Sequence, residues 1–241
     1  MFETVDNSVV RKHLHQIFTR IPVRYDLINH IITFGMDTGW REKAALACLE
    51  GNPTRILDLC CGTGDLAITI AKLARYNPEI TGVDYSQPML VIASRKQRSF
   101  TNKISFIHAD VAKLPFEDCY FDCIGISFAF RNLTFNNPMR PIYLKEIFRV
   151  LRSGGRFVIV ESSQPSCAFI RLCDNLYLSS WVFTSGYLLS GNKEAYRYLV
   201  ESVRDFFSVK EMEDFLLNSG FVNVTSRKLF FGAAAIHTAI K

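Results

Sequence analysis

The stretch R-I-L-D-L-C-C-G-T-G-D at residues 55–65 decides the fold of this chain. Residues 55–59 are mostly apolar and include a β-branched isoleucine, which predicts a short buried strand. Gly62, Thr63 and Gly64 then predict a tight turn in which the backbone closely approaches a ligand. Residues 66–74 are good helix formers and are apolar on almost every side. A strand, a glycine turn and a buried helix form the first βα unit of a nucleotide-binding sheet.

The glycine turn is compatible with two kinds of ligand. Its spacing matches the dinucleotide fingerprint, and Asp84 follows at the distance of about twenty residues that the fingerprint requires. Asp58 and Asp65, however, would place two carboxylates where a pyrophosphate binds, and like charges in a poorly solvated cleft are costly. A ligand with an ammonium, a sulfonium, a ribose and no phosphate fits these charges better. They favour S-adenosylmethionine over NAD, with a merely structural turn as the third alternative.

Length and composition indicate a single soluble enzyme domain over residues 1–241. Hydrophobic residues make up 49% and charged residues 21% of the chain, a balance typical of a globular protein. The net charge of +5 is spread without a basic run, so we expect no nucleic-acid partner. Seven cysteines, an odd number without a C-x-x-C pair, predict a reducing cytosol and no metal site.

No segment of the sequence predicts secretion or a membrane span. The first twenty residues are charged throughout and lack the apolar core of a signal peptide. No charged residue lies between Asp174 and Lys193, but this interval is too rich in Ser, Asn, Thr and Gly for a transmembrane helix. We expect a buried or interfacial helix there and a cytoplasmic protein.

Strands and helices alternate along the rest of the chain. This alternation predicts an α/β fold with a mostly parallel seven-stranded sheet, helices on both faces and an antiparallel C-terminal strand. Residues 1–50 are predicted as a helical N-terminal cap, and residues 165–218 as a mostly helical insert on the substrate side. The predicted strands cover residues 55–59, 80–84, 104–109, 121–128, 156–161, 221–226 and 229–240, with a helix over residues 140–151.

Acidic residues end the first three predicted strands, at Asp58, Asp84 and Asp110. Ligands of open α/β sheets bind at the carboxyl ends of the strands, so these side chains are expected to share one site. Asp84 is placed to accept both ribose hydroxyls, and Asp110, with the backbone of Val111, to receive the adenine amino group. Ser127 ends the fourth strand on the same rim. Each acid alone is equally well explained as a helix N-cap or a turn residue.

These residues resemble class I S-adenosylmethionine-dependent methyltransferases, whose fold is Rossmann-like. Longer segments are similar to the ubiquinone/menaquinone biosynthesis C-methyltransferase family, from near residue 15 to the C-terminus. They include R-Y-D at 24–26, S-F-A-F-R-N at 127–132, V-L-R-S-G-G-R at 150–156 and E-A-Y-R-Y-L-V-E-S at 194–202. The segments that contain Arg131-Asn132 and residues 196–202 are the most specific.

The resemblance implies transfer of a methyl group to a ring carbon of a polyprenylated hydroquinone. The acceptor would be demethylmenaquinol, giving menaquinol, or the benzoquinol intermediate of ubiquinone biosynthesis, with S-adenosylhomocysteine as the second product. The family's catalytic positions fall on Arg131, Asn132 and Tyr25. The complete predicted donor site consists of Asp58, Gly62, Thr63, Gly64, Asp84, Tyr85, Asp110, Val111 and Ser127.

Carbon methylation requires an electron-rich ring carbon, which a hydroquinone supplies when one hydroxyl loses its proton. We expect Arg131 to stabilise that phenolate or to orient a water that removes the proton, because arginine itself stays protonated. Asn132 would orient a ring oxygen and Tyr25 would close the pocket. The alternatives are a surface ion pair for Arg131, ordinary packing for Tyr25, and for His237 either a base or a structural role.

Two other functions stay open on the sequence. The first is a methyltransferase for another small apolar acceptor, and the second is an NAD-dependent oxidoreductase or a binding module. The insert at residues 163–191 departs most from the family pattern, and its aromatics either line a tunnel for a prenyl tail or pack as a helical core. A prenylated acceptor implies transient contact with the inner face of the cytoplasmic membrane, and a homodimer is a further expectation. The insert's aromatics are Phe169, Tyr177, Trp181, Phe183 and Tyr187.

Overall fold

The computed structural model describes residues 22–98 and 104–241, with the side chains of residues 22–25 left out. Two predictions concern residues 1–21 and lie outside the described residues. They are the first part of the helical cap and the absence of a signal peptide. So does the predicted role of the Tyr25 side chain, although its backbone belongs to the first described helix.

Seven strands form one sheet in the order β3-β2-β1-β4-β5-β7-β6, which confirms the predicted fold class. β1 to β5 pair in parallel, and β7 runs antiparallel between β5 and β6. The strands are β1 Arg55–Leu59, β2 Glu79–Asp84, β3 Ile104–His108, β4 Phe121–Ser127, β5 Leu151–Ser162, β6 Val222–Leu229 and β7 Ala234–Ile240.

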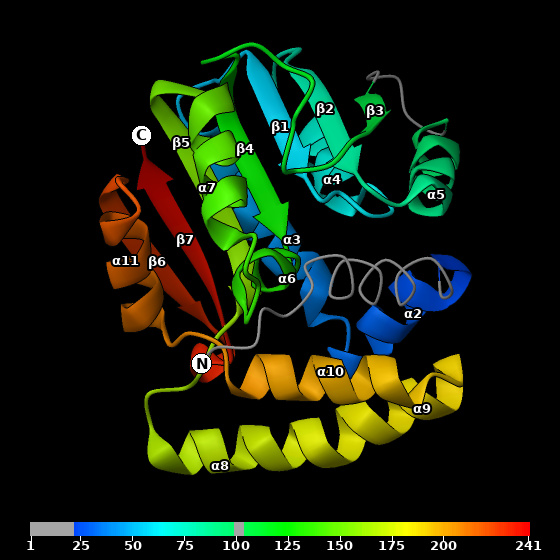
Figure 1. Cartoon of the computed structure of the whole chain (residues 1–241). Coiled ribbons are helices and arrows are strands. Elements are labelled where there is room, and N and C mark those ends of the chain that lie inside the picture. The colour runs from blue at the N-terminus through cyan, green and yellow to red at the C-terminus, as the bar shows by residue number, and fades with distance from the viewer. Residues whose placement is uncertain (1–21, 99–103) are drawn as a thin grey trace.

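Helices cover both faces of the sheet and the edge to which the parallel strands point (Figure 1). The helices that pack against the sheet are α3 Met36–Leu49, α4 Asp65–Leu73, α5 Gln87–Gln97, α6 Phe130–Thr134, α7 Arg140–Val150 and α11 Val209–Asn218. The layer beyond the carboxyl ends of the strands contains α2 Pro22–Ile32, α8 Ala168–Tyr177, the π-helical turn η1 Leu178–Val182, α9 Phe183–Ser190 and α10 Lys193–Arg204.

The alternation of side chains along the strands builds a separate apolar core on each face. In β1, Leu57 and Leu59 point into the core that includes Ile147 of α7 and Leu216 of α11. Ile56, which precedes them, points to the opposite core under α3 and α4. Because neighbouring positions of a strand face opposite sides, a run that is apolar at every position is a strand buried on both faces.

A third apolar cluster holds the helical layer together. Ile28 and Ile32 of α2 pack with Leu178 of η1 and Tyr196 of α10. The N-terminal helix and the insert, distant in sequence, therefore form one layer over the carboxyl ends of the strands (Figure 1).

The structure differs from the sequence prediction in two connections. The predicted last strand, residues 229–240, is interrupted by the 3-10 turn η2 Phe230–Gly232, in which Phe230 and Phe231 adopt left-handed backbone angles with φ of 40° and 55°. The fourth strand leads directly into α6, a single helical turn that the sequence pattern did not predict. Both are local backbone reversals too short to show a periodic pattern.

The contact between α9 and α10 predicts a strong effect of one methyl group. Gly186 of α9 lies against the ring of Tyr196, which a Cβ at position 186 would overlap. Overpacking costs about 1–3 kcal/mol, so we expect Gly186→Ala to lower the free energy of unfolding in urea by that amount. Gly39→Ala in α3 is the matched control, because its Cβ would meet no described atom within 4 Å. It should be neutral or stabilising by up to about 1 kcal/mol. Equal stability of the two variants would contradict this packing.

Candidate active site

A cavity of about 300 Å³ lies between the carboxyl ends of β1, β2 and β4 and the helices α2 and α10. It brings together most of the residues predicted from the sequence. The predicted residues on its wall are Asp58, Gly62, Thr63, Asp84, Tyr85, Asp110, Val111, Ser127, Arg131 and Asn132. Gly64 does not line the cavity; its left-handed backbone (φ 81°) lets α4 begin where a Cβ would meet the Phe106 ring at 2.8 Å.

Two carboxylates fix the glycine turn through its backbone. The N–H of Gly62 donates to Oδ2 of Asp84 at 2.8 Å, and the N–H of Ser86 donates to its Oδ1 at 2.7 Å. The N–H of Ala67, in the first turn of α4, donates to Oδ2 of Asp58 at 2.9 Å. These bonds use part of each carboxylate's accepting capacity, because an ionised carboxylate has about four lone-pair sites.

The electrostatics of this wall favour a cationic ligand. Burial raises the pKa of Asp58 to about 8, with further increases from the charges of Asp84 and Asp65, against the opposing hydrogen bond from Ala67. Burial also raises the pKa of Asp84. A positive group bound here would lower both pKa values and stabilise the ionised carboxylates. The geometry therefore suits the sulfonium and ammonium of S-adenosylmethionine.

The remaining donor positions offer hydrogen-bonding groups. Asp110 accepts from the N–H of Ala112 at 2.9 Å, and Val111 beside it is buried on the cavity wall. The hydroxyls of Ser86 and Ser127 are buried and have no hydrogen-bond partner among the described residues. A buried polar atom without a partner is costly, so a ligand with ribose and adenine groups fits this wall.

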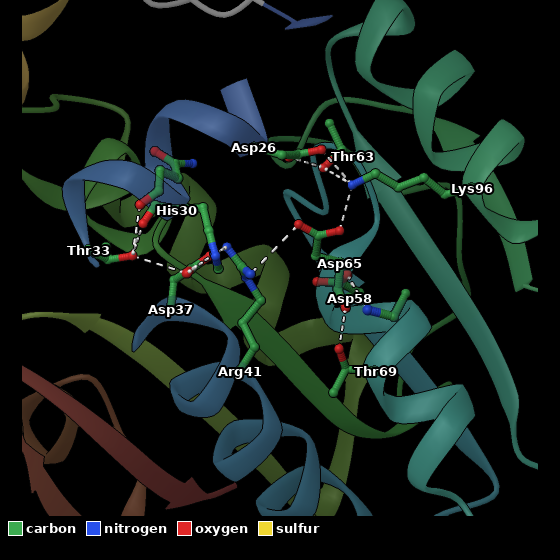
Figure 2. Close-up of polar contacts among 12 residues, drawn as sticks. Asp26, His30, Thr33, Asp37, Arg41, Asp58, Thr63, Asp65, Thr69 and Lys96 are labelled. Atoms are coloured by element: carbon green, nitrogen blue, oxygen red, sulfur yellow. Dashed lines mark hydrogen bonds and ion pairs between the residues drawn. The ribbon is translucent and has the colours of Figure 1, made fainter. Parts of the chain in front are cut away.

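An ion-pair network ties α2 to the glycine turn (Figure 2). Nζ of Lys96 in α5 lies 2.6 Å from Oδ2 of Asp26 in α2 and 2.6 Å from Oδ1 of Asp65 in α4. Thr63 donates to Asp26 at 2.6 Å and accepts from Lys96 at 3.0 Å. The predicted donor residue Thr63 therefore also holds α2 in place.

The network continues along α3 (Figure 2). Arg41 lies 2.9 Å from Asp37 and 3.7 Å from Asp65, and His30 of α2 lies 3.1 Å from Asp37. Arg41 and Lys96 thus bring positive charge to the rim of an otherwise acidic cleft. The amino-acid end of S-adenosylmethionine carries a carboxylate as well as an ammonium, and Arg41, which lines the cavity, can receive it.

Arg131 of α6 is held in a buried ion pair, so the alternative of a surface ion pair is wrong. Nη1 donates to Oε1 of Glu161 at 3.0 Å, the backbone N–H donates to Oε2 at 3.1 Å, and Nε donates to Oγ of Ser202 at 2.9 Å. The Arg131 and Glu161 side chains are only 4% and 0% exposed. Nη2 makes no hydrogen bond to a described residue, and Arg131 lines the cavity, so its free corner is available to a ligand.

Two more polar groups share this end of the cavity. Oδ1 of Asn132 is buried without a partner among the described residues. Burial raises the pKa of Tyr198 in α10, the charge of Arg131 lowers it, and the charge of Glu161 raises it.

His237 lies outside the cavity. It is buried in β7 and hydrogen-bonded to Ser226 at 2.7 Å, and burial lowers its pKa to about 4. It does not line the cavity, which favours its structural role.

Several site residues were missed from the sequence. Glu161 carried the same signal as the predicted acids, since it lies near the carboxyl end of a strand. Asp26 and Ser202 stood inside segments that were recognised, but no spacing related them to Thr63 or Arg131. Lys96 and Arg41 had no sequence signal, because each is one exposed-looking cation on an amphipathic helix.

Comparison with known proteins identifies the family. A model described as the ubiE/COQ5 methyltransferase family matches residues 6–241. This chain belongs to that family. The demethylmenaquinone methyltransferase of Staphylococcus aureus (strain JH9) is 35% identical over 236 residues, which cover 98% of this chain and 96% of that protein. The sequence-based assignment to a methyltransferase with S-adenosylmethionine as donor is thereby confirmed, and the NAD alternative finds no support.

Solved structures agree with the fold. A SAM-dependent methyltransferase from Thermotoga maritima superposes with a TM-score of 0.63 at 19% identity, covering 94% of this chain and 99% of that one. A phosphoethanolamine N-methyltransferase of Haemonchus contortus, solved with S-adenosyl-L-methionine, has a TM-score of 0.56 at 15% identity, covering 83% and 52%. Among the described residues of this chain, no group of three or more His, Cys, Asp or Glu side chains could hold a metal ion.

The raised pKa of Asp58 predicts proton release on donor binding. At pH 7 the carboxyl is mostly protonated in the free protein, and pairing with the cationic end of the ligand lowers its pKa, so a proton leaves. We expect titration calorimetry with S-adenosylhomocysteine, in buffers of different ionisation enthalpy, to show release of a substantial fraction of one proton near pH 7. The release should vanish above pH 9 and in Asp58→Asn. Equal proton release by Asp58→Asn and the unmodified chain would contradict the assignment.

Proposed function

We propose that this methyltransferase methylates a ring carbon of demethylmenaquinol, giving menaquinol, with Arg131 stabilising the reacting phenolate. The observation that carries the proposal is the placement of Arg131: its side chain is 4% exposed and lines the cavity, and its Nη2 makes no hydrogen bond to a described residue. The similarity to the S. aureus demethylmenaquinone methyltransferase over nearly the full length of both chains supports this acceptor.

The fixed cation lowers the energy of the charge that develops on the ring. The donor supplies a methyl group on a sulfonium centre, which a ring carbon can attack. Loss of a hydroxyl proton to water makes that carbon nucleophilic, and Arg131 donates hydrogen bonds to the resulting oxyanion. Because Glu161 and Ser202 hold the guanidinium through Nη1 and Nε, its Nη2 is already oriented before the acceptor binds.

The remaining steps return the ring to its aromatic state. As the new carbon–carbon bond forms, the carbon–sulfur bond of the donor breaks and its electron pair stays on sulfur. The ring carbon then loses its own proton to solvent, and the phenolate is reprotonated. Asn132 orients a ring oxygen through its side-chain amide, whose Oδ1 is otherwise without a described partner. The closing role of Tyr25 stays a prediction.

The acceptor also sets where the enzyme works. A polyprenyl tail keeps the hydroquinone in the bilayer, so the enzyme makes transient contact with the inner surface of the cytoplasmic membrane. Within residues 22–98 and 104–241, none of the helices combines the length and the hydrophobicity of a membrane-spanning segment. A homodimer remains an expectation from the sequence.

Methyl transfer from labelled donor tests the acceptor directly. Prenylated demethylmenaquinol and the corresponding benzoquinol are offered side by side in detergent, under reducing conditions. We expect label in the naphthoquinol product. Label only in the benzoquinol would move the enzyme to ubiquinone biosynthesis, and label in both would indicate one enzyme for two pathways. No label in either, with S-adenosylhomocysteine still bound, would contradict the proposed acceptor but not the methyltransferase fold.

The role of Arg131 is tested best by lysine. Alanine would leave Glu161 charged, buried and unpaired, a situation that costs about 3–5 kcal/mol of stability. Arg131→Lys keeps the charge but loses the planar fork, and we expect turnover to fall about 10²-fold or more while the affinity for S-adenosylhomocysteine stays nearly unchanged. Arg156→Lys is the matched control, since Arg156 pairs with Glu50 at 2.6 Å and neither residue lines the cavity. Weakened donor binding in Arg131→Lys, with turnover retained, would contradict the role.

A further inference from the structure

Exposed apolar side chains follow the outward side of the rod formed by α8, η1 and α9. Phe169 and Leu188, near its two ends, are 73% and 74% exposed. The step of five residues from Leu176 to Trp181 spans η1, whose wider turn keeps both side chains on the exposed side. We call this set the outer face: Phe169, Leu172, Leu176, Trp181 and Leu188. The sequence analysis placed five aromatics of the insert either in a tunnel or in a core. Three of them are exposed: Phe169, Trp181 and Tyr187. None of the five lines the donor cavity.

The opposite side of the same rod is firmly packed. Leu178 and Val182 belong to the apolar cluster of the helical layer, and Gly186 lies directly against Tyr196 of α10. The outer face is therefore presented by an anchored element. Phe34, at the turn after α2, is 65% exposed and stacks on Trp181 with ring centroids 5.6 Å apart. It extends the apolar surface towards the helix that carries Asp26.

The charges around the rod complement an anionic surface. Residues 175–192 contain no charged side chain. Exposed cations border this neutral stretch: Nζ of Lys228 lies 3.5 Å from Oγ of Ser166 before α8, and Arg204 donates to Ser179 at 2.7 Å. The acids that flank it are Asp174, half-buried in α8, and Glu194, exposed at the start of α10. Lys193 follows the end of α9 and is exposed. An apolar helix face bordered by basic residues is the pattern of a helix that lies in the headgroup region of a membrane.

We propose that the outer face docks on the surface of a bilayer that contains anionic lipids. The proposal rests on the proposed function, because it is the prenylated acceptor that must be collected from lipid. α10 separates the outer face from the cavity: Tyr196 contacts Gly186 of α9, and both Tyr196 and Tyr198 line the cavity. Docking through the outer face therefore places the rod and α10 between the bilayer and the cavity.

Vesicle binding by the full chain tests this face. The probe is a vesicle of equimolar phosphatidylglycerol and phosphatidylcholine, with pure phosphatidylcholine as the neutral comparison. The variant is Leu172→Gln with Leu188→Gln, and the matched control is Leu46→Gln with Leu217→Gln, two exposed leucines on α3 and α11. We expect the outer-face variant to lose at least about tenfold in partitioning to anionic vesicles, because it loses two leucines' worth of buried apolar surface. The control should partition like the unmodified chain, and all should bind S-adenosylhomocysteine equally.

Activity separates docking from chemistry. Methylation of a demethylated hydroquinone without a tail, in solution, should be equal in all variants, whereas methylation of the tailed quinol in vesicles should fall only in the outer-face variant. Unchanged vesicle binding by that variant would overturn the docking proposal. A second result would also overturn it: the unmodified chain forms a dimer and does not bind vesicles, and the outer-face substitutions dissociate that dimer. A second copy of the chain would then cover this face. If no quinol is methylated under any condition, the proposed function fails while the vesicle measurement still decides the docking.

Discussion

The hydrogen bonds from the backbone of the glycine turn and of α4 to the carboxylates of Asp84 and Asp58 determine the geometry of the site. Asp84, at the end of β2, receives the N–H of Gly62, and Asp58, inside the end of β1, receives the N–H of Ala67. One bond fixes the beginning of the turn and the other fixes the first turn of α4. Because the turn lies between neighbouring parallel strands, its position also sets where the end of β2 presents Asp84, and the residues after it present Ser86, to the cavity.

Several features that lower the stability of the folded protein lie around the cavity. Among the described residues, Asp58 is buried without a countercharge at hydrogen-bond distance, and Arg131 is the cation that pairs with the buried Glu161. The backbone adds to the cost, since Cys60 and Phe128, which follow β1 and β4, both have φ of 53° and both line the cavity. A left-handed conformation at residues other than glycine costs of order 1 kcal/mol or more each and persists only where the surrounding structure enforces it. Such costs gathered around one cavity are typical of a site shaped for ligands.

The fold and the donor wall could be predicted because they depend on local patterns. Apolar runs gave the strands, and the acids at their ends lie together because parallel strands end at one edge of the sheet. The acceptor end could be predicted only through family resemblance. Arg131 is bound by Glu161 and Ser202, 30 and 71 positions away, and these pairings follow from the adjacency of β4 and β5 and from the docking of α10. The ties between α2 and the glycine turn, through Asp26 and Lys96, were likewise invisible, because tertiary packing alone selects the partner of a charged helix residue.

Helix α2 borders both halves of the reaction chamber. Asp26 binds Thr63 and Lys96 beside the donor, while Asn29 and Ile32 of the same helix line the cavity and Ile28 packs into the layer that covers its other end. Replacing spent donor with fresh donor therefore disturbs a wall that the acceptor also contacts, and the two binding equilibria become linked. Linkage is reciprocal: if bound quinol raises the affinity for the donor by some factor, bound donor raises the affinity for the quinol by the same factor. A helix that was recognised only as a cap thus couples the affinities for the two substrates.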